Sequence, residues 1–328
     1  MSIAVTYPGG SGGPAQPCPK SAPPMPCQGI GMSSSAEVDA FADDMAKLQD
    51  EWPSLKGADR LARLQTMVDA RAASAGFPAP GIIAPEGLGG RYGELRFNQW
   101  RIAINRSLVT SERLSPEQTA QLGETLYHET RHAEQWSLIA KRQAGEGLAP
   151  NQIRNTLYVP EKVASDAATQ PLLPTDPRRP CADALHKSIY GADRHARNMT
   201  ITNLEEHGQA YASANEEYER SVDEEQRLMS QFLREEQSYI ACKERNPPPT
   251  KSELDALAKR CNDSAAKLRA AKLRSAECRR SVDAAEQTYS KTYTDYRMLP
   301  EEADAWDSGG RTSKAIMARF LDSAHGVA

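Results

Sequence analysis

The sequence predicts an α+β protein that is mainly α. Three observations lead to this prediction. Apolar residues recur at helical spacing over most of the chain, residues 94–105 alternate between apolar and polar as short strands do, and two very long helical stretches flank a run of prolines. With 328 residues, the chain can bury one large hydrophobic core or two smaller ones.

Charge and hydropathy exclude some classes of protein. Charged residues make up 26% of the chain, aromatic residues 6%, and the formal net charge is −4. Lysine and arginine are interspersed with acids instead of forming a basic stripe, so we expect no nucleic-acid partner. No segment approaches the roughly 18 consecutive apolar residues of a membrane-spanning helix, so none is expected.

Residues 1–34 are rich in proline, glycine and serine and are expected to form an irregular tail. This tail lacks the basic start and the apolar block of a secretory signal peptide. We therefore expect a protein that is not exported by the Sec route in this form.

The first half of the chain predicts helices and then strands. Two helices are expected after the tail, the second of them over residues 58–75. Prolines and glycines should break any regular element over residues 78–90. Residues 94–98 and 100–105 then predict two short strands around a tight turn.

The best-defined helix of the sequence begins at Ser115. Ser115 is a favourable N-cap, Pro116 suits the first helical position, and Gln118 can close a capping box. We expect this helix to continue past Ala140 and to end at Gly145.

The second half of the chain predicts a helical hairpin. Residues 204–244 read as one long helix, which the prolines at 247–249 must end. Ser252 then caps a second long helix, whose apolar and small residues recur at alternating steps of three and four, as in a heptad seam. We expect the two helices to pair antiparallel and to project from the main body.

These elements divide the chain into four parts. They are an N-terminal tail (1–34), a core that contains the capped helix (35–172), an inserted helical region with the long hairpin (173–297), and a C-terminal helix (298–328).

The chain has six cysteines, too few and too dispersed for a disulfide scaffold, and no CxxC pair that would indicate a cysteine zinc site. Cys242 and Cys261 lie on opposite arms of the expected hairpin, and we predict that they form a disulfide. The other candidate pairs are Cys18 with Cys27 and Cys181 with Cys278. Unpaired thiols are the alternative.

The capped helix carries the pattern HExxH within YHETRHAEQW, residues 127–136. Positions i and i+4 share a face of a helix, so His128 and His132 can direct ring nitrogens at one ion about 2.0–2.1 Å from each. Glu129 can then take the proton of a zinc-activated water as the water attacks a carbonyl. Gln135 returns to the same face. The alternative is a surface helix with two incidental histidines.

A catalytic zinc site needs a third protein ligand and an open position for water. The pattern HExxHxxGxxH is not met, because Gln135 and Leu138 stand where it has glycine and histidine. The best source of the third ligand is YRMLPEEADAW, residues 296–306. Pro300 can begin a helix there, and acids are favourable in the first turn.

Together, HExxHxxQ and the later YRxLPxExDAW resemble the zincin-like metallopeptidase domains of bacterial polymorphic toxins and contractile-injection effectors of the type VI kind. The resemblance covers about residues 90–145 and 295–325. It implies a gluzincin-type core with a small sheet and one Zn²⁺ ion, and it makes the long interval between the two motifs an inserted hairpin.

The resemblance also implies roles for residues. In that family the glutamate two residues after the proline is the third zinc ligand, which corresponds to Glu302. His128 and His132 would be the other two ligands, and Glu129 the general base.

Several alternatives remain open for the rest of the site. Glu301 or Asp304 could be the third ligand instead, and His207 is a further candidate. A group that stabilises the oxyanion is needed as well. The candidates for it are Tyr293, Tyr296 and His207.

The expected function is that of a zinc metallopeptidase toxin acting on a protein or peptide substrate. Absence of a Sec signal peptide, the Pro/Gly-rich tail and the possible disulfides fit delivery to the periplasm of a target cell or to a host cell. An immunity protein or a secretion-system carrier would be the partner.

Two other functions remain open. One is hydrolysis of cell-wall amides, since the same site can polarise either kind of amide. The other is a binding module whose hairpin docks a partner and whose zinc site is not catalytic. Glu129 argues against the second, because a structural zinc site has no need of a general base.

Overall fold

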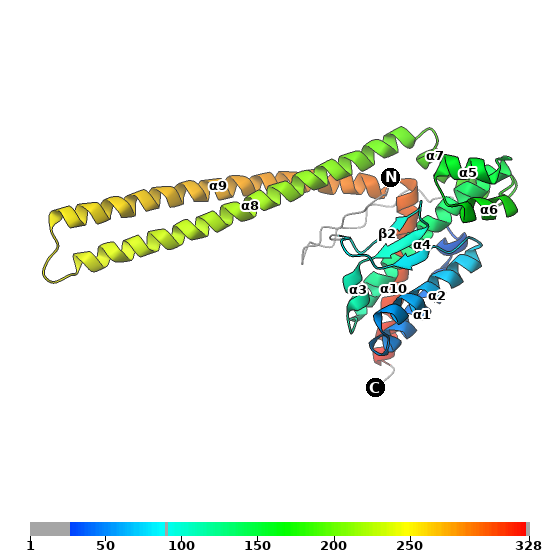
Figure 1. Ribbon diagram of the computed structural model, residues 1–328, viewed down its shortest axis with the longest axis horizontal. Helices are drawn as coiled ribbons and strands as arrows, with labels where there is room; N and C mark the ends of the chain where they lie inside the picture. Colours follow the sequence, from blue (N-terminus) through cyan, green and yellow to red (C-terminus); the bar gives the residue numbers. More distant parts are fainter. Residues whose placement is uncertain (1–26, 89–90, 326–328) are drawn as a thin grey trace. The chain divides into compact units, whose positions relative to one another are not determined.

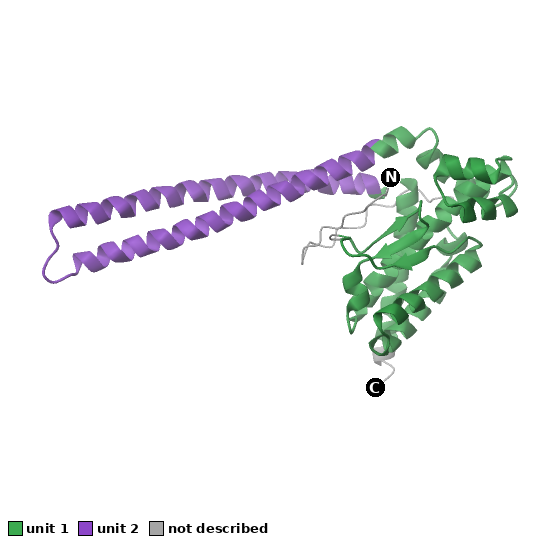
Figure 2. Ribbon diagram, in the orientation of Figure 1, with its two compact units in different colours: residues 1–198, 297–328 green, residues 199–296 purple. Residues whose placement is uncertain are grey.

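The computed structural model describes residues 27–88 and 91–325. The described part is mainly helical with one three-stranded sheet, as expected for an α+β protein that is mainly α (Figure 1). It divides into two compact units (Figure 2). Unit 1 comprises residues 1–198 and 297–328, and unit 2 comprises residues 199–296.

The sheet has the strand order β1-β3-β2. Its strands are β1 (Gly81–Ile83), β2 (Gly93–Arg96) and β3 (Arg101–Ile104). β2 and β3 pair antiparallel, with Leu95 opposite Ile102, so the two predicted strands are confirmed. β2 is the edge strand next to helix α4.

The expectation that residues 78–90 contain no regular element is wrong. Gly81, Ile82 and Ile83 form β1, which pairs parallel with β3. A strand of three residues, placed between Pro80 and Pro85, is too short to display strand alternation, and it pairs with a strand that begins 20 residues later, Gly81 opposite Arg101.

Two helices follow the N-terminal segment, α1 (Ser35–Glu51) and α2 (Gly57–Ala75). Ser34 caps α1 by accepting a hydrogen bond of 3.3 Å from the backbone of Glu37. α2 ends at Gly76, whose φ of 75° suits glycine at a helix C-terminus. Both helices contact the central helix α4.

Helix α4 (Pro116–Gly145) lies at the centre of unit 1 and contacts α10, α6, α7 and β2. The capping box of Ser115 and Gln118 is present as predicted. Most of α4 beyond its first turn is buried, including charged side chains, which is typical of a helix covered on several sides. The remaining helices of unit 1 are short, except for α10. They are α3 (Arg106–Thr110), α5 (Pro150–Leu157), α6 (Glu161–Thr169), α7 (Arg179–Ile189) and α10 (Pro300–His325).

The unit boundary differs from the sequence-based division of the chain. Residues 173–198 belong to unit 1, although the sequence interpretation begins the inserted region at residue 173. The reason is packing, because α7 contacts both α4 and α10. Residues 27–34, expected to be part of the tail, are also packed in unit 1, and Cys27 and Met32 are fully buried.

Unit 2 is an antiparallel helical hairpin, as predicted. It is formed by α8 (Arg194–Lys243) from residue 199 onward and by α9 (Lys251–Arg297) up to residue 296 (Figure 2). Leu228 and Leu268 pack across the pair, and Tyr211 stacks on Tyr289 with ring centroids 5.9 Å apart. Small buried residues on α9, such as Ser264, allow close approach of the helices.

All three predicted disulfide pairs are wrong. The disulfide of the structure joins Cys27 to Cys181, 154 residues apart, so neither can pair with Cys18 or Cys278. Cys18 lies outside the described residues.

Cys242 and Cys261 are both unpaired in the described part of the chain. Cys242 lies at the end of α8, whereas Cys261 lies ten residues into α9, an axial offset of about 13 Å at about 1.5 Å per residue. A disulfide requires Cα atoms within about 7 Å. The offset therefore explains why the hairpin carries no bridge there.

Within residues 27–88 and 91–325, no helix is both long and apolar enough to cross a membrane.

Candidate metal centre

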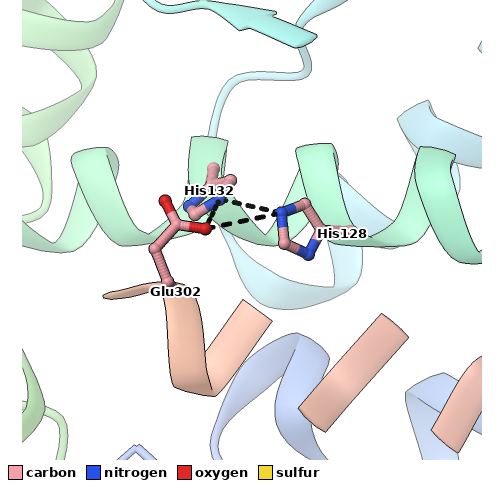
Figure 3. A group of neighbouring side chains, drawn as sticks. All are labelled: His128, His132 and Glu302. Atoms are coloured by element: carbon pink, nitrogen blue, oxygen red, sulfur yellow. Dashed lines mark hydrogen bonds and ion pairs between the residues drawn. The ribbon is translucent and has the colours of Figure 1, made fainter. Parts of the chain in front are cut away.

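Helices α4 and α10 bring the three predicted metal ligands together (Figure 3). His128 and His132 lie one turn apart on α4, and Glu302 lies in the first turn of α10. The Nε2 atoms of the two histidines are 3.1 Å apart. Glu302 Oε2 lies 3.5 Å from Nε2 of His132 and 3.9 Å from Nε2 of His128.

These separations fit a zinc ion. Three ligand atoms at about 2.0–2.1 Å from a tetrahedral ion lie about 3.3 Å from one another. The observed separations of 3.1, 3.5 and 3.9 Å bracket that value. Two imidazole nitrogens with one carboxylate oxygen are also a donor set that zinc takes in catalytic sites.

The close packing of α10 on α4 places Glu302. α10 begins at Pro300, as the sequence predicts. A Cβ atom on Gly309 would lie only 3.2 Å from the carbonyl oxygen of Glu124 and 3.3 Å from Cβ of His128. A glycine at this point therefore lets α10 approach α4 at the turn that carries His128.

The two histidines are buried, with 4% of His128 and 8% of His132 exposed. Burial, together with the neighbouring His132, lowers the pKa of His128 to about 3, so this imidazole is neutral at pH 7. Burial also opposes the charged form of His132, but Glu302, Glu129 and Gln135 together outweigh it and raise the pKa of His132 to about 9. A metal ion must displace that proton, so binding should release protons.

Gln135 determines which nitrogen of His132 is available to a metal. The Gln135 side chain donates from Nε2 to the carbonyl oxygen of Glu301 at 2.9 Å and to Oδ2 of Asp304 at 2.8 Å. Its Oε1 therefore faces Nδ1 of His132, at 2.8 Å, and must accept a hydrogen bond from the N–H group there. This hydrogen bond leaves the lone pair on Nε2 of His132, the atom that faces His128 and Glu302.

Glu129 is buried beside the metal ligands and is not one of them. Its Oε2 accepts a hydrogen bond of 2.7 Å from the backbone N–H of Leu95, so edge strand β2 holds the carboxylate in place. Burial raises the pKa of Glu129 to about 7. A carboxyl group with a pKa near neutrality is well matched to general-base catalysis at that pH.

The alternative third ligands have other partners. Glu301 accepts a hydrogen bond of 2.7 Å from Ser188 and pairs with Arg197. Asp304 pairs with Arg131 at 2.7 Å. Among the described residues, the group that could hold a metal contains Glu302 and neither of these acids.

The second motif supplies more of the site than its metal ligand. The ring of Trp306 lies 4.6 Å from the ring of His128, and the guanidinium of Arg297 lies 4.4 Å above Trp306. Asp304 holds Gln135. The sequence interpretation gave Arg297 and Trp306 no role and considered Asp304 only as an alternative metal ligand, although the pattern YRxLPxExDAW contains all three.

The three candidates for oxyanion stabilisation belong to unit 2. His207 Nδ1 lies 2.8 Å from the hydroxyl of Thr292, and Tyr293 stacks between Tyr289 and Tyr296. His207 is also absent from the metal-binding group of the described residues. The role of Tyr293, Tyr296 or His207 in oxyanion stabilisation stays a prediction.

Comparisons of the chain with protein-family models, curated proteins and solved structures found no match.

Proposed function

We propose that this protein is a zinc-dependent, zincin-like peptidase that hydrolyses peptide bonds in a protein or peptide substrate. The observation that carries the proposal is the arrangement of Glu129 beside the group formed by His128, His132 and Glu302. Three ligands leave one position of a tetrahedral ion open for water. The carboxylate of Glu129 is buried close enough to His132 and Glu302 to interact electrostatically with both.

A zinc ion in this site would polarise the scissile carbonyl and lower the pKa of the attacking water. Glu129 would accept the proton that this water loses as its oxygen bonds to the carbonyl carbon. Glu129 would then return the proton to the leaving amine as the C–N bond breaks. The Leu95 N–H keeps one carboxylate oxygen in place, so the other is available for this proton transfer.

The Cys27–Cys181 disulfide supports an oxidising destination for the protein. We propose that it acts as an effector toxin that is delivered to the periplasm of a target cell or to a host cell. An immunity protein or a secretion-system carrier would then be its partner.

Replacing Glu129 by glutamine tests the proposal. The variant should keep one zinc per chain but lose about 10²–10⁴-fold in the rate of hydrolysis of a labelled unfolded protein, because general-base catalysis typically supplies that factor. Glu117→Gln, at the exposed start of the same helix, is the matched control and should retain parental activity.

The proposal is wrong if Glu129→Gln hydrolyses the labelled protein at the parental rate. Purified peptidoglycan serves as a second substrate. If the parent cleaves peptidoglycan and leaves unfolded protein intact, the enzyme is a cell-wall amide hydrolase instead of a peptidase.

A further inference from the structure

Behind the metal ligand His132, a chain of buried polar contacts continues away from the site. Gln135 connects His132 to Asp304, which accepts a hydrogen bond of 2.7 Å from Nε of Arg131. Arg131 pairs in turn with Glu134. Arg131 is fully buried, and the exposed fractions of Glu134 and Asp304 are 2% and 4%.

This chain of contacts ends on the backbone of the N-terminal segment, residues 27–33. The Met32 N–H donates to Oε2 of Glu134 at 3.1 Å, and Arg131 donates from Nη1 to the carbonyl oxygen of Ile30 at 3.3 Å. The Tyr127 hydroxyl donates to the carbonyl oxygen of Met32. The segment therefore supplies both a donor and acceptors to the buried charges of α4.

Gly31 shows how closely the segment fits. Its φ is 55°, and a Cβ atom there would lie 1.8 Å from Oε1 of Glu134. Gly29 has a similar φ of 77°, but a Cβ atom on it would meet nothing within 4 Å. Only Gly31 is therefore required for close approach to the carboxylate.

The segment is tethered by the disulfide between Cys27 and Cys181, both fully buried. Cys181 lies in α7, which contacts α4 and α10, the two helices that carry the metal ligands. The disulfide therefore joins the segment to α7, which packs on α4, the helix whose side chains the segment's backbone contacts.

We propose that Arg131 and Glu134 are positioning residues for the metal ligand His132, and that the Cys27–Cys181 disulfide completes this support by holding residues 27–33 in place. The proposal rests on the proposed function in taking zinc as the metal. Its physical basis is the high free-energy cost of a buried charge that loses a partner. If the segment moves, Glu134 loses the Met32 N–H, Arg131 and Asp304 must readjust, and Gln135 no longer orients His132.

The experiment compares zinc affinity in two pairs of variants of the full chain. The first pair is Gly31→Ala against Gly29→Ala, which both place alanine at a positive φ but differ in contact with Glu134. The second pair is Cys27→Ser with Cys181→Ser against Cys242→Ser with Cys261→Ser. The dissociation constant for zinc is measured by competition with a chelator. The visible spectrum of the Co²⁺-loaded protein reports the ligand geometry, and circular dichroism checks the fold.

Gly31→Ala and the Cys27/Cys181 variant should bind zinc about 10–100-fold more weakly than the parent, the usual effect of losing support for a metal-bound histidine. Their Co²⁺ spectra should change, whereas both control variants should match the parent. A folded Gly31→Ala variant with parental zinc affinity and an unchanged Co²⁺ spectrum overturns the proposal, whether or not the cysteine variant folds.

These measurements do not depend on turnover. If Glu129→Gln abolishes hydrolysis while Gly31→Ala binds zinc normally, the positioning proposal fails and the proposed function stands. If Gly31→Ala weakens zinc binding but the parent hydrolyses neither substrate, the proposed function fails and the positioning proposal stands.

Discussion

In unit 1 most charged side chains of α4 are buried, whereas in unit 2 those of α8 and α9 lie mostly at the surface. Arg131 is fully buried and bonds to two carboxylates. The pair Arg279–Asp283 in α9, by contrast, has both side chains 55% exposed. What is buried along the hairpin is largely a stripe of apolar and small residues.

The difference in burial shows which charged side chains are fixed by their surroundings. Burying a charge is unfavourable unless it is paired and hydrogen-bonded, so the polar groups of α4 can hold only a few arrangements. Surface ion pairs contribute about 0–1 kcal/mol and tolerate change. Matched substitutions in the two units should therefore have unequal effects.

The largest difference is expected between substitutions of the candidate metal ligands and substitution of a histidine in unit 2. His128→Ala and Glu302→Ala each remove one of three proposed protein ligands. Losing a group that only supports a ligand typically weakens metal binding by up to about 100-fold, so losing a ligand itself should weaken zinc binding by more than that. His207→Ala, in unit 2, should leave zinc affinity unchanged. Metal analysis of the purified proteins after dialysis measures this. Equal zinc in all three variants would contradict the comparison.

Core substitutions should differ next. Leu126 is fully buried in unit 1, and Leu268 packs in the small apolar cluster of the hairpin. Leu126→Ala should lower the free energy of unfolding by about 2–5 kcal/mol, and Leu268→Ala by less, because fewer neighbours surround its cavity. Urea unfolding followed by circular dichroism gives both values. A larger loss for Leu268→Ala would refute the expectation.

Two helical glycines provide a smaller contrast. Gly309→Ala places Cβ against the backbone oxygen of Glu124, so α10 must shift, and a loss of about 1–3 kcal/mol in stability is expected. Gly208→Ala meets only the ring of Tyr289, at 3.3 Å, and alanine is the better helix former by about 0.5–1 kcal/mol. Its stability should therefore stay equal or rise. Thermal unfolding measures the stability of the two variants. A Gly309→Ala variant more stable than Gly208→Ala would contradict the close approach of α10 to α4 at Gly309.

The smallest effect is expected from removing most of the hairpin. The two helices of the hairpin are close together at the level of Gly208 and Tyr289, so a short glycine-serine linker from residue 209 to residue 291 can replace residues 210–290. This variant should bind zinc as tightly as the parent, because all three ligands lie in unit 1. A chelator competition assay measures the affinity. Loss of zinc from the shortened, folded protein would show that unit 2 takes part in the metal centre.

Local patterns in the sequence predicted most of the fold and two of the three candidate metal ligands. Ser115 and Gln118 define the start of α4 within one turn. His128 and His132 share a face because they lie four residues apart on that helix, which is also a local property of the sequence. Glu302 was predicted from a second motif, since nothing local connects it to α4. The long helices were predicted because their periodicity repeats many times.

The missed features depend on contacts between distant residues. The Cys27–Cys181 pair joins positions 154 residues apart, and no pattern in the sequence links them. The hydrogen bond between Met32 and Glu134 also joins residues that are 102 positions apart in the sequence. β1 is too short for alternation and exists only by pairing with β3.

The most direct test of the central claim is the zinc K-edge X-ray absorption spectrum of the purified protein. A zinc site built from His128, His132, Glu302 and water should show four nitrogen or oxygen ligands at about 2.0–2.1 Å. Two of them should have the scattering signature of imidazole, and no sulfur should appear at about 2.3 Å. A sulfur shell, or a spectrum without the two imidazoles, would contradict a metal centre built from His128, His132 and Glu302.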